Sequence, residues 1–159
     1  NFTKNGMGKW AQNIGENWLV IPTETDPPVH TAYRKALNSH FAPQKMFAMK
    51  DQVRERARTL IDQFKDKGAC DFIADFSEKF PIFIVLDLLG LPQERMAEFL
   101  KWEKELLHSN DWEVRGNAVR CVKNYLLEEI EARRVAPRDD YISKILTFEV
   151  DGRLWNIVR

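Results

Sequence analysis

A histidine and an arginine lie four residues apart in the segment Asp26-Pro27-Pro28-Val29-His30-Thr31-Ala32-Tyr33-Arg34. Residues at this spacing project from the same face of an α-helix, so His30 and Arg34 would present two donor groups side by side. Two adjacent cationic groups repel each other when nothing negative lies between them. Their types and spacing therefore predict a site for an anion. On spacing alone, the better interpretation is a surface helix that the pair caps while it contacts acids such as Glu24.

The residues before this pair predict how its helix begins. Proline is tolerated in a first helical turn, where its missing N–H would have had no partner. Pro28 also disfavours the helical conformation at Pro27, because the residue before a proline is pushed towards extended geometry. The carboxylate of Asp26 can lie at the positive end of the helix. We expect a helix over residues 28–39.

Helical periodicity continues through most of the chain and predicts an all-α fold. Apolar residues recur at three- and four-residue steps in several segments, separated by Gly, Pro and Asn-Asp breaks. A turn at residues 151–152 could close a small hairpin. The expected helices cover residues 9–13, 28–39, 43–67, 72–89, 92–107, 112–134 and 141–146.

Composition fits a soluble globular domain and excludes several classes of function. The chain has 159 residues, 44% of them apolar, which is enough for one domain with a core. Lys and Arg together number 24, as do Asp and Glu, so overall charge does not favour nucleic acid or an anionic membrane. No apolar run is long enough to span a bilayer. The two cysteines do not make a disulfide scaffold, and we expect a cytoplasmic protein.

The proline-led motif and the residues before it, Leu19-Val20-Ile21-Pro22-Thr23-Glu24-Thr25, resemble the start of helix C in bacterial cytochrome P-450 monooxygenases. The resemblance implies that His30 and Arg34 bind the propionates of haem (iron protoporphyrin IX). Local matches support it at Asp71-Phe72, at Leu88-Leu89-Gly90-Leu91-Pro92 and at Asp139-Asp140 before Asp151-Gly152-Arg153. The branch that includes the camphor hydroxylase is the most similar. The residues after Arg153 depart from the family pattern.

The order of elements resembles helices C to H of that fold. Residues 1–25 would form the loop region before helix C and residues 26–159 would form the helices, as one partial domain without a second. The chain begins at Asn1 without an initiator Met and stops inside an apolar-periodic stretch, so an internal piece of a longer protein is expected.

The resemblance implies a haem iron held by a Cys thiolate in a Phe-x-x-Gly-x-x-x-Cys loop, which favours O–O cleavage. Neither Cys70 nor Cys121 has that context, and we expect both to be ordinary buried or half-buried residues. No catalytic residue and no metal ligand are therefore predicted within residues 1–159. The expected activity, insertion of one oxygen atom from O2, belongs to the parent enzyme, and this piece alone should be inactive.

The resemblance also indicates where substrate and partner would bind. Trp18, Thr23 and His108 are candidates for the substrate pocket, and a small hydrophobic substrate such as a terpenoid is expected. Each also fits a simpler role: a loop anchor, a local turn bond, or a cation at a helix C-terminus. Lys35 is the candidate for docking a ferredoxin or flavodoxin-type electron donor. We expect a monomer that binds neither nucleic acid nor membrane. The alternative is a non-enzymatic all-helical interaction or small-ligand-binding module.

Overall fold

The computed structural model describes residues 9–16, 20–38, 40–150 and 152–154, and these are mainly helical. The elements are α2 (Lys9–Asn13), α3 (Val29–Asn38), α4 (Pro43–Ala48), α5 (Lys50–Asp62), η1 (Lys65–Lys67), η2 (Ile73–Ser77), α6 (Lys79–Leu89), η3 (Gln93–Arg95), α7 (Met96–His108), α8 (Trp112–Val135), α9 (Tyr141–Ile145), β1 (Glu149–Val150) and β2 (Arg153–Leu154). The all-α fold class predicted from periodicity is confirmed, with the two short strands forming one antiparallel hairpin.

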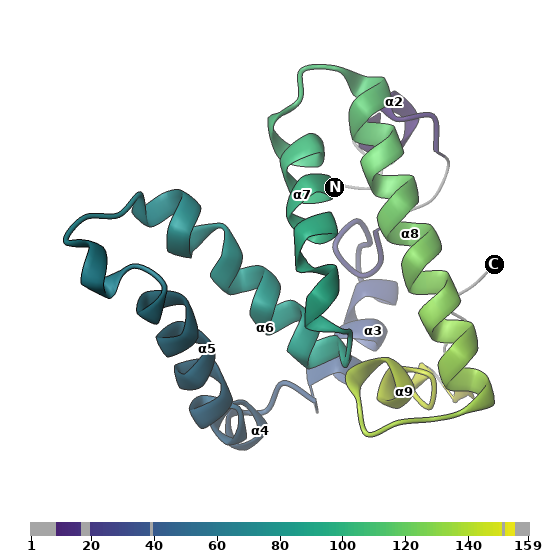
Figure 1. The fold of residues 1–159 in the computed structure, drawn as a ribbon. Coiled ribbons are helices and arrows are strands. Elements are labelled where there is room, and N and C mark those ends of the chain that lie inside the picture. Colours follow the sequence, from purple (N-terminus) through teal and green to yellow (C-terminus); the bar gives the residue numbers. More distant parts are fainter. Residues whose placement is uncertain (1–8, 17–19, 39, 151, 155–159) are drawn as a thin grey trace.

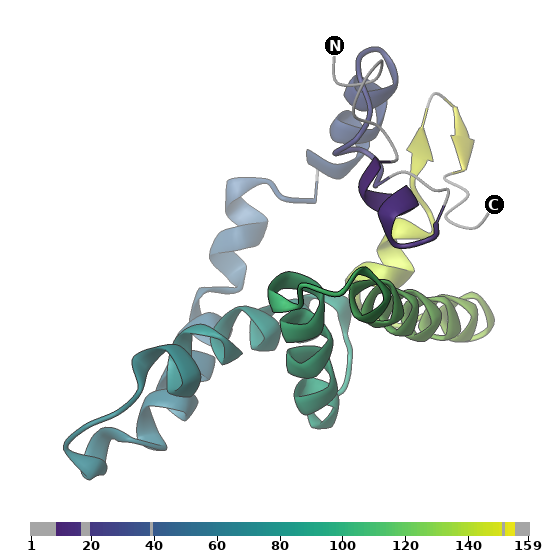
Figure 2. The same ribbon diagram turned by 90° about the horizontal axis from the view of Figure 1, so that it is seen from above.

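The helices form a body and a projecting arm (Figure 1). In the body, α7 and α8 pack side by side, and α9 lies against the C-terminal end of α8. The arm consists of α5 and α6, which are joined at its tip and extend away from α7 and α8 in both views (Figures 1 and 2). Helix α3 contacts strand β1, so the segment with the His–Arg pair lies beside the hairpin.

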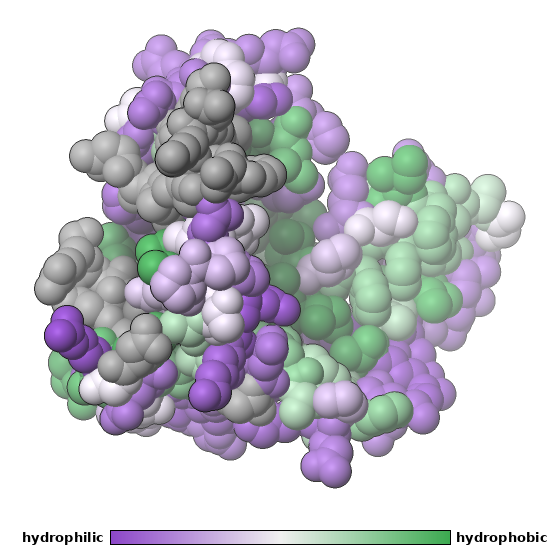
Figure 3. Space-filling view, turned by 180° about the vertical axis from the view of Figure 1, so that it is seen from behind, coloured by the Kyte–Doolittle hydropathy of each residue, from purple (hydrophilic) through white to green (hydrophobic). Residues whose placement is uncertain are grey.

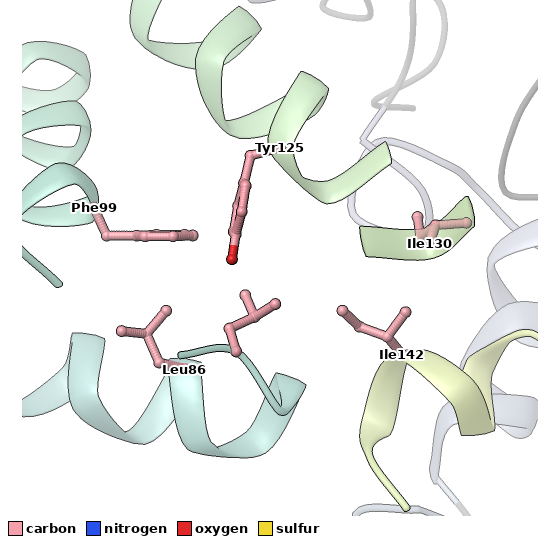
Figure 4. Packing of buried hydrophobic residues seen from close by; sticks show 6 residues of the cluster. Leu86, Phe99, Tyr125, Ile130 and Ile142 are labelled. Carbon is pink, nitrogen blue, oxygen red and sulfur yellow. The ribbon is translucent and has the colours of Figure 1, made fainter. Parts of the chain in front are cut away.

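The core lies where the arm meets the body. Six buried apolar residues from α6, α7, α8, α9 and the α6–α7 link pack together (Figure 4): Leu86, Leu91, Phe99, Tyr125, Ile130 and Ile142. The aromatic rings of Phe99 and Tyr125 meet edge to face, with centroids 5.6 Å apart. This geometry is favourable for aromatic pairs because the positive ring edge meets the negative ring face. The buried apolar residues of α6, α7 and α8 thus show which face of each helix points into the core.

A buried arginine joins three parts of this core. Arg133, on α8, has a fully buried side chain. Its Nε donates to Asp140 at 2.8 Å, and its Nη2 donates to the Gly90 carbonyl at 2.8 Å. Nη1 donates to Glu129, one helical turn back. We call Arg133, Glu129, Asp140 and Gly90 the Arg133 cluster. Because Gly90 ends α6 and Asp140 precedes α9, the cluster links the ends of three helices.

Asp140 is held in its ionised form by its neighbours. Burial by itself would raise the pKa of Asp140, but hydrogen bonds from Ser143 and Arg133 bring that pKa below its ordinary value. Its Oδ1 accepts from the Ser143 backbone N–H at 2.8 Å, which caps the first turn of α9. The same carboxylate therefore caps one helix and neutralises the arginine of another.

The arm has its own ion pair. The Arg56 guanidinium on α5 donates two hydrogen bonds to the Asp87 carboxylate on α6, at 2.7 and 2.8 Å. The Asp87 side chain is only 7% exposed, and the Gln93 amide also donates to it. Two parallel bonds between a guanidinium and a carboxylate are stronger and more directional than a single one. This pair therefore fixes how α5 lies on α6.

We expect Asp87→Asn to lower the free energy of unfolding by about 1.5–3 kcal/mol, because the neutral amide cannot accept both bonds from the guanidinium. The matched control is Asp51→Asn on the same arm, where the carboxylate is 93% exposed and pairs with Arg54 one turn away. An exposed pair of this kind contributes about 0.5 kcal/mol or less. Urea unfolding followed by circular dichroism measures both variants. Equal losses would show that the Arg56–Asp87 pair does not stabilise the arm.

Two predicted helices are interrupted in the structure. The helix expected over 43–67 is divided at Met49 into α4 and α5, followed by the separate turn η1 and by Gly68 with φ +72°. The helix expected over 72–89 begins as the π-helical turn η2, with three phenyl rings, Phe72, Phe76 and Phe80, stacked at 5.1 Å centroid separations. Phe72 is 57% exposed, so the apolar spacing of this segment, which is typical of a buried helix, does not bury its start.

The prediction for the cysteines is also wrong, since Cys70 and Cys121 are both exposed. Cys70 lies at the tip of the arm, between η1 and η2, and Cys121 lies on the outer face of α8. Figure 3 shows hydrophobic side chains gathered over the arm. The exposed apolar residues of the arm include Ile61, Ile73 and Val85. Across the described parts of the chain, none of the helices is both long and apolar enough to cross a bilayer.

Candidate functional site

Helix α3 carries both residues of the predicted anion site. The helix begins at Val29, and its first turn is formed by bonds from the His30 and Ala32 amides to the carbonyls of Asp26 and Pro28, both 3.1 Å. The expected start at residue 28 is therefore correct within one residue. His30 is half-buried and Arg34 is exposed one turn later on the same helix.

No acid in the described part of the chain neutralises either side chain of the pair. Among the described residues, neither the His30 imidazole nor the Arg34 guanidinium makes an ion pair or a hydrogen bond to protein. Glu24, the acid that spacing offered as a partner, instead accepts the Val20 backbone N–H at 2.8 Å. The simple surface-pair interpretation therefore has no support at Glu24.

An imidazole and a guanidinium without acidic partners form a donor set suited to carboxylates. The guanidinium can bind a carboxylate through two parallel bonds, and the imidazole can donate one more. Haem carries two propionate carboxylates, and the His30 and Arg34 donors fit them in charge and in hydrogen-bonding type. The structure thus places the donors together on one helix, as the sequence predicted.

The structure describes two of the three candidates for the substrate pocket. Thr23 is exposed in the turn before α3, and Trp18 lies outside the described residues. His108 is exposed at the end of α7 and lines a cavity of about 360 Å³ with residues of the same helix end, Lys101, Lys104, Glu105 and Ser109. His30 and Arg34 do not line that cavity. Lys35, the candidate for donor docking, is exposed on α3 beside Arg34.

A second cavity was not foreseen from the sequence. It measures about 510 Å³ and lies between α4, the C-terminal end of α6, and α9. Its walls include His40, Lys45 and Tyr141, which are up to a hundred residues apart in the chain. No spacing rule connects side chains from such distant segments, because their proximity depends on how the helices pack.

The described residues form a mainly helical protein in which one helix, α3, carries both His30 and Arg34. No protein-family model matches the chain. It is 36% identical over 145 residues to the probable cytochrome P-450 127A1 of Sinorhizobium fredii, covering 91% of this chain and 35% of that protein. It is 34% identical over 157 residues to the 6-deoxyerythronolide B hydroxylase of Saccharopolyspora erythraea, covering 96% and 37%.

Comparison with solved structures finds the fold of the same family. The cytochrome P-450 PksS of the bacillaene polyketide synthase from Bacillus subtilis has the same fold, with a TM-score of 0.79, 24% identity, and coverage of 94% of this chain and 38% of that one. The chain belongs to the cytochrome P-450 family. The cofactor of this family is haem, in agreement with the prediction. The chain spans about a third of the length of these relatives, and they do not single out the camphor-hydroxylase branch.

Proposed function

We propose that this chain forms the propionate-binding part of a haem-thiolate monooxygenase that inserts one oxygen atom from O2 into a small hydrophobic substrate. The observation that carries the proposal is the His30–Arg34 pair, one turn apart on α3 and without an acidic partner among the described residues, in a chain of this family. When bound and held by a cysteine thiolate, the haem would supply the activation of dioxygen.

The residues of this chain would bind and orient the cofactor. Arg34, which is exposed, can turn towards a propionate and neutralise it with two hydrogen bonds. His30, which is half-buried, has less freedom and would fix the position of the second contact. The thiolate would come from a cysteine other than Cys70 and Cys121, since neither lies in a Phe-x-x-Gly-x-x-x-Cys loop.

The substrate class and the electron donor are parts of the same proposal. A small hydrophobic substrate, such as a terpenoid, is supported by the apolar and aromatic content of the chain and not by a described pocket. A ferredoxin or flavodoxin-type donor would present acidic groups, and exposed Lys35 on α3 offers a basic contact close to the haem-binding pair.

The test uses the full polypeptide that the gene encodes. We expect Arg34→Ala to weaken haem retention by about ten- to a hundredfold, because a hydrogen-bonded charge contact contributes about 1.5–3 kcal/mol. The haem-to-protein ratio after gel filtration and the Soret band of the reduced, carbon monoxide-bound protein measure the effect. Arg58→Ala is the matched control, because it removes the same charge from an exposed site on α5.

Two results would overturn the proposal. Haem occupancy that is unchanged in Arg34→Ala, or lowered equally in Arg58→Ala, would remove the propionate role. A full polypeptide without thiolate haem would favour the alternative of a non-enzymatic helical module.

A further inference from the structure

Helix α3 carries the His30–Arg34 pair but has no buried face of its own. None of its described side chains is buried, and strand β1 is the described element that it contacts most. Figure 2 shows the hairpin of β1 and β2 beside this helix. Most helical stability in proteins comes from packing an apolar face, so a helix without a buried face is weakly held by its own side chains. The position of α3 therefore depends on the segments at its two ends.

The segment before α3 is held by hydrogen bonds within itself. The Glu24 amide donates to the Val20 carbonyl at 2.8 Å, and the amide and hydroxyl of Thr25 both donate to the Pro22 carbonyl, at 3.1 and 2.7 Å. These bonds shape the turn over residues 20–25 but do not join it to the core helices. Contacts that reach α9 are found instead at the C-terminal end of α3.

The C-terminal end of α3 leads directly into two aromatic rings. The His40 amide donates to the Leu37 carbonyl at 2.9 Å, and the Phe41 amide donates to the Asn38 carbonyl at 3.2 Å. Leu37 and Asn38 belong to the last turn of α3. Because these backbone bonds tie His40 and Phe41 to that turn, the places of the two rings determine where the end of the helix lies.

Both rings pack on the segment that runs from α9 to β1. The His40 ring stacks on Phe148 with centroids 4.1 Å apart, and the Phe41 ring meets Tyr141 edge to face at 5.3 Å. Phe148 is buried, and its ring meets Tyr141 at nearly a right angle. We call His40, Phe41, Tyr141 and Phe148 the aromatic cluster.

The His40 ring stacks as a neutral group. Its pKa is lowered from the ordinary value, first by burial and then by the positive charges of Lys45 and Lys144. An ordinary imidazole has a pKa of about 6.5, so this ring is uncharged at neutral pH. Its stack on Phe148 therefore depends on a flat ring and not on a charge, and a phenyl ring could replace it.

The aromatic cluster is joined to the core through α9. Tyr141 is the first residue of α9 and follows Asp140, the carboxylate that accepts from buried Arg133. The Phe148 amide donates to the Ile145 carbonyl at the end of α9, at 3.0 Å. A continuous set of contacts therefore runs from the buried arginine to the end of α3.

We propose that the stack of His40 on Phe148 positions the His–Arg pair of α3 for the haem propionates. This inference rests on the function proposed above, and it gives His40 a role exerted through α3 and not by contact with the cofactor. Arg34 lies one turn before the last residue of α3, so a shift of that end moves its guanidinium. Bonds from a guanidinium to a carboxylate depend on direction, so such a shift weakens haem binding.

Haem loss from the full polypeptide that the gene encodes tests the role of His40. His40→Ala removes the ring and should speed the loss of haem to an excess of apomyoglobin about two- to tenfold, the range that corresponds to one aromatic pair. His40→Phe keeps a flat ring on Phe148 and should restore the rate to near that of the unsubstituted protein. Phe72→Ala is the matched control, because it removes an exposed ring from the phenyl stack of the arm and should leave the rate unchanged.

Combination with Arg34→Ala distinguishes positioning from a general loss of stability. If His40 acts through the His–Arg pair, its substitution should speed haem loss clearly less once Arg34 is absent, because coupled residues are not additive. A general loosening of the protein would add fully to the effect of Arg34→Ala. Circular dichroism melts show whether each variant is folded. Phe148→Leu, which keeps an apolar side chain but removes the stacked ring, carries the test if His40→Ala unfolds.

Four results would each overturn the positioning role and leave the propionate role of Arg34 intact. They are unchanged haem loss in His40→Ala, the same increase in Phe72→Ala, no restoration by His40→Phe, and full additivity with Arg34→Ala. Unchanged haem loss in Arg34→Ala itself would overturn the proposed function, and the positioning role with it.

Discussion

Replacing Arg133 with alanine is expected to lower the free energy of unfolding by about 3–5 kcal/mol, the cost of leaving a buried charge without its partner. The guanidinium is completely buried, and the side chain of its partner Asp140 is 6% exposed. Burial alone would lower the pKa of Arg133, but its hydrogen bonds to Asp140 and Glu129 raise that pKa above its ordinary value. The variant would leave Asp140 and the Gly90 carbonyl without this donor.

The neighbouring residue provides the control. Arg134 is next along α8, and its guanidinium lies 3.5 Å from Glu131 with 42% of the side chain exposed. Arg134→Ala removes the same side chain and should change the free energy of unfolding by about 0.5 kcal/mol or less. Urea unfolding curves of both variants, read by circular dichroism, give the comparison. Similar losses at the two positions would show that the Arg133 cluster does not hold the three helix ends together.

The expected loss is large relative to the total free energy of unfolding. A domain of this size has a free energy of unfolding of about 5–15 kcal/mol, so losing the Arg133 cluster would remove much of it. Because the cluster joins the ends of α6 and α8 to the start of α9, its loss should loosen that junction before it affects the α5–α6 pairing in the arm. Hydrogen exchange of the α9 amides, compared with that of α5, would show the difference.

Much of the helical layout follows from local rules that act within a few residues. The short helix at residues 9–13, the proline-led α3 and the long α8 were predicted close to their observed bounds. Capping residues and apolar spacing determine such elements within the segment itself. The Asp140 cap of α9, which accepts from the Ser143 amide, is an example of this local control.

The missed features depend on contacts between distant segments. Nothing in the spacing around Met49 predicts that the helix there is interrupted, or that Phe72 is exposed at the start of a π-helical turn. The burial of Arg133 is a second case, because a charged residue with acids one turn away is usually a solvent-exposed pair. Its burial requires the Gly90 carbonyl, 43 residues away.

The same distinction between local spacing and distant contacts applies to the candidate sites. The His30–Arg34 pair could be found because both residues lie on one helix at a fixed spacing, although its haem-binding role stays a prediction. The cavity between α4, the end of α6 and α9 could not be found, since its walls come from distant segments whose packing does not follow from residue spacing. Spacing therefore locates sites within one element and misses sites between elements.

Gly90→Ala is expected to lower the free energy of unfolding by more than the cost of backbone strain alone. Gly90 ends α6 with φ +69°, a left-handed conformation that costs a residue with a side chain about 1–2 kcal/mol. A Cβ added there would lie 2.4 Å from the Asp140 Cβ and 2.7 Å from Asp140 Oδ2, the oxygen that accepts from Arg133. Asp140 must therefore move, which weakens the Arg133 cluster and brings the expected loss to about 3 kcal/mol or more.

Gly68→Ala separates the two contributions. Gly68 has φ +72° and no atom within 4 Å of an added Cβ, so its substitution should cost only the strain of about 1–2 kcal/mol. Combining Gly90→Ala with Arg133→Ala gives a further comparison, because residues in one network do not lose stability additively. If the methyl group acts by displacing Asp140, it should cost clearly less once Arg133 is absent. Equal losses for the two glycines, or full additivity in the double variant, would mean that Asp140 accommodates the methyl group and that only backbone strain remains.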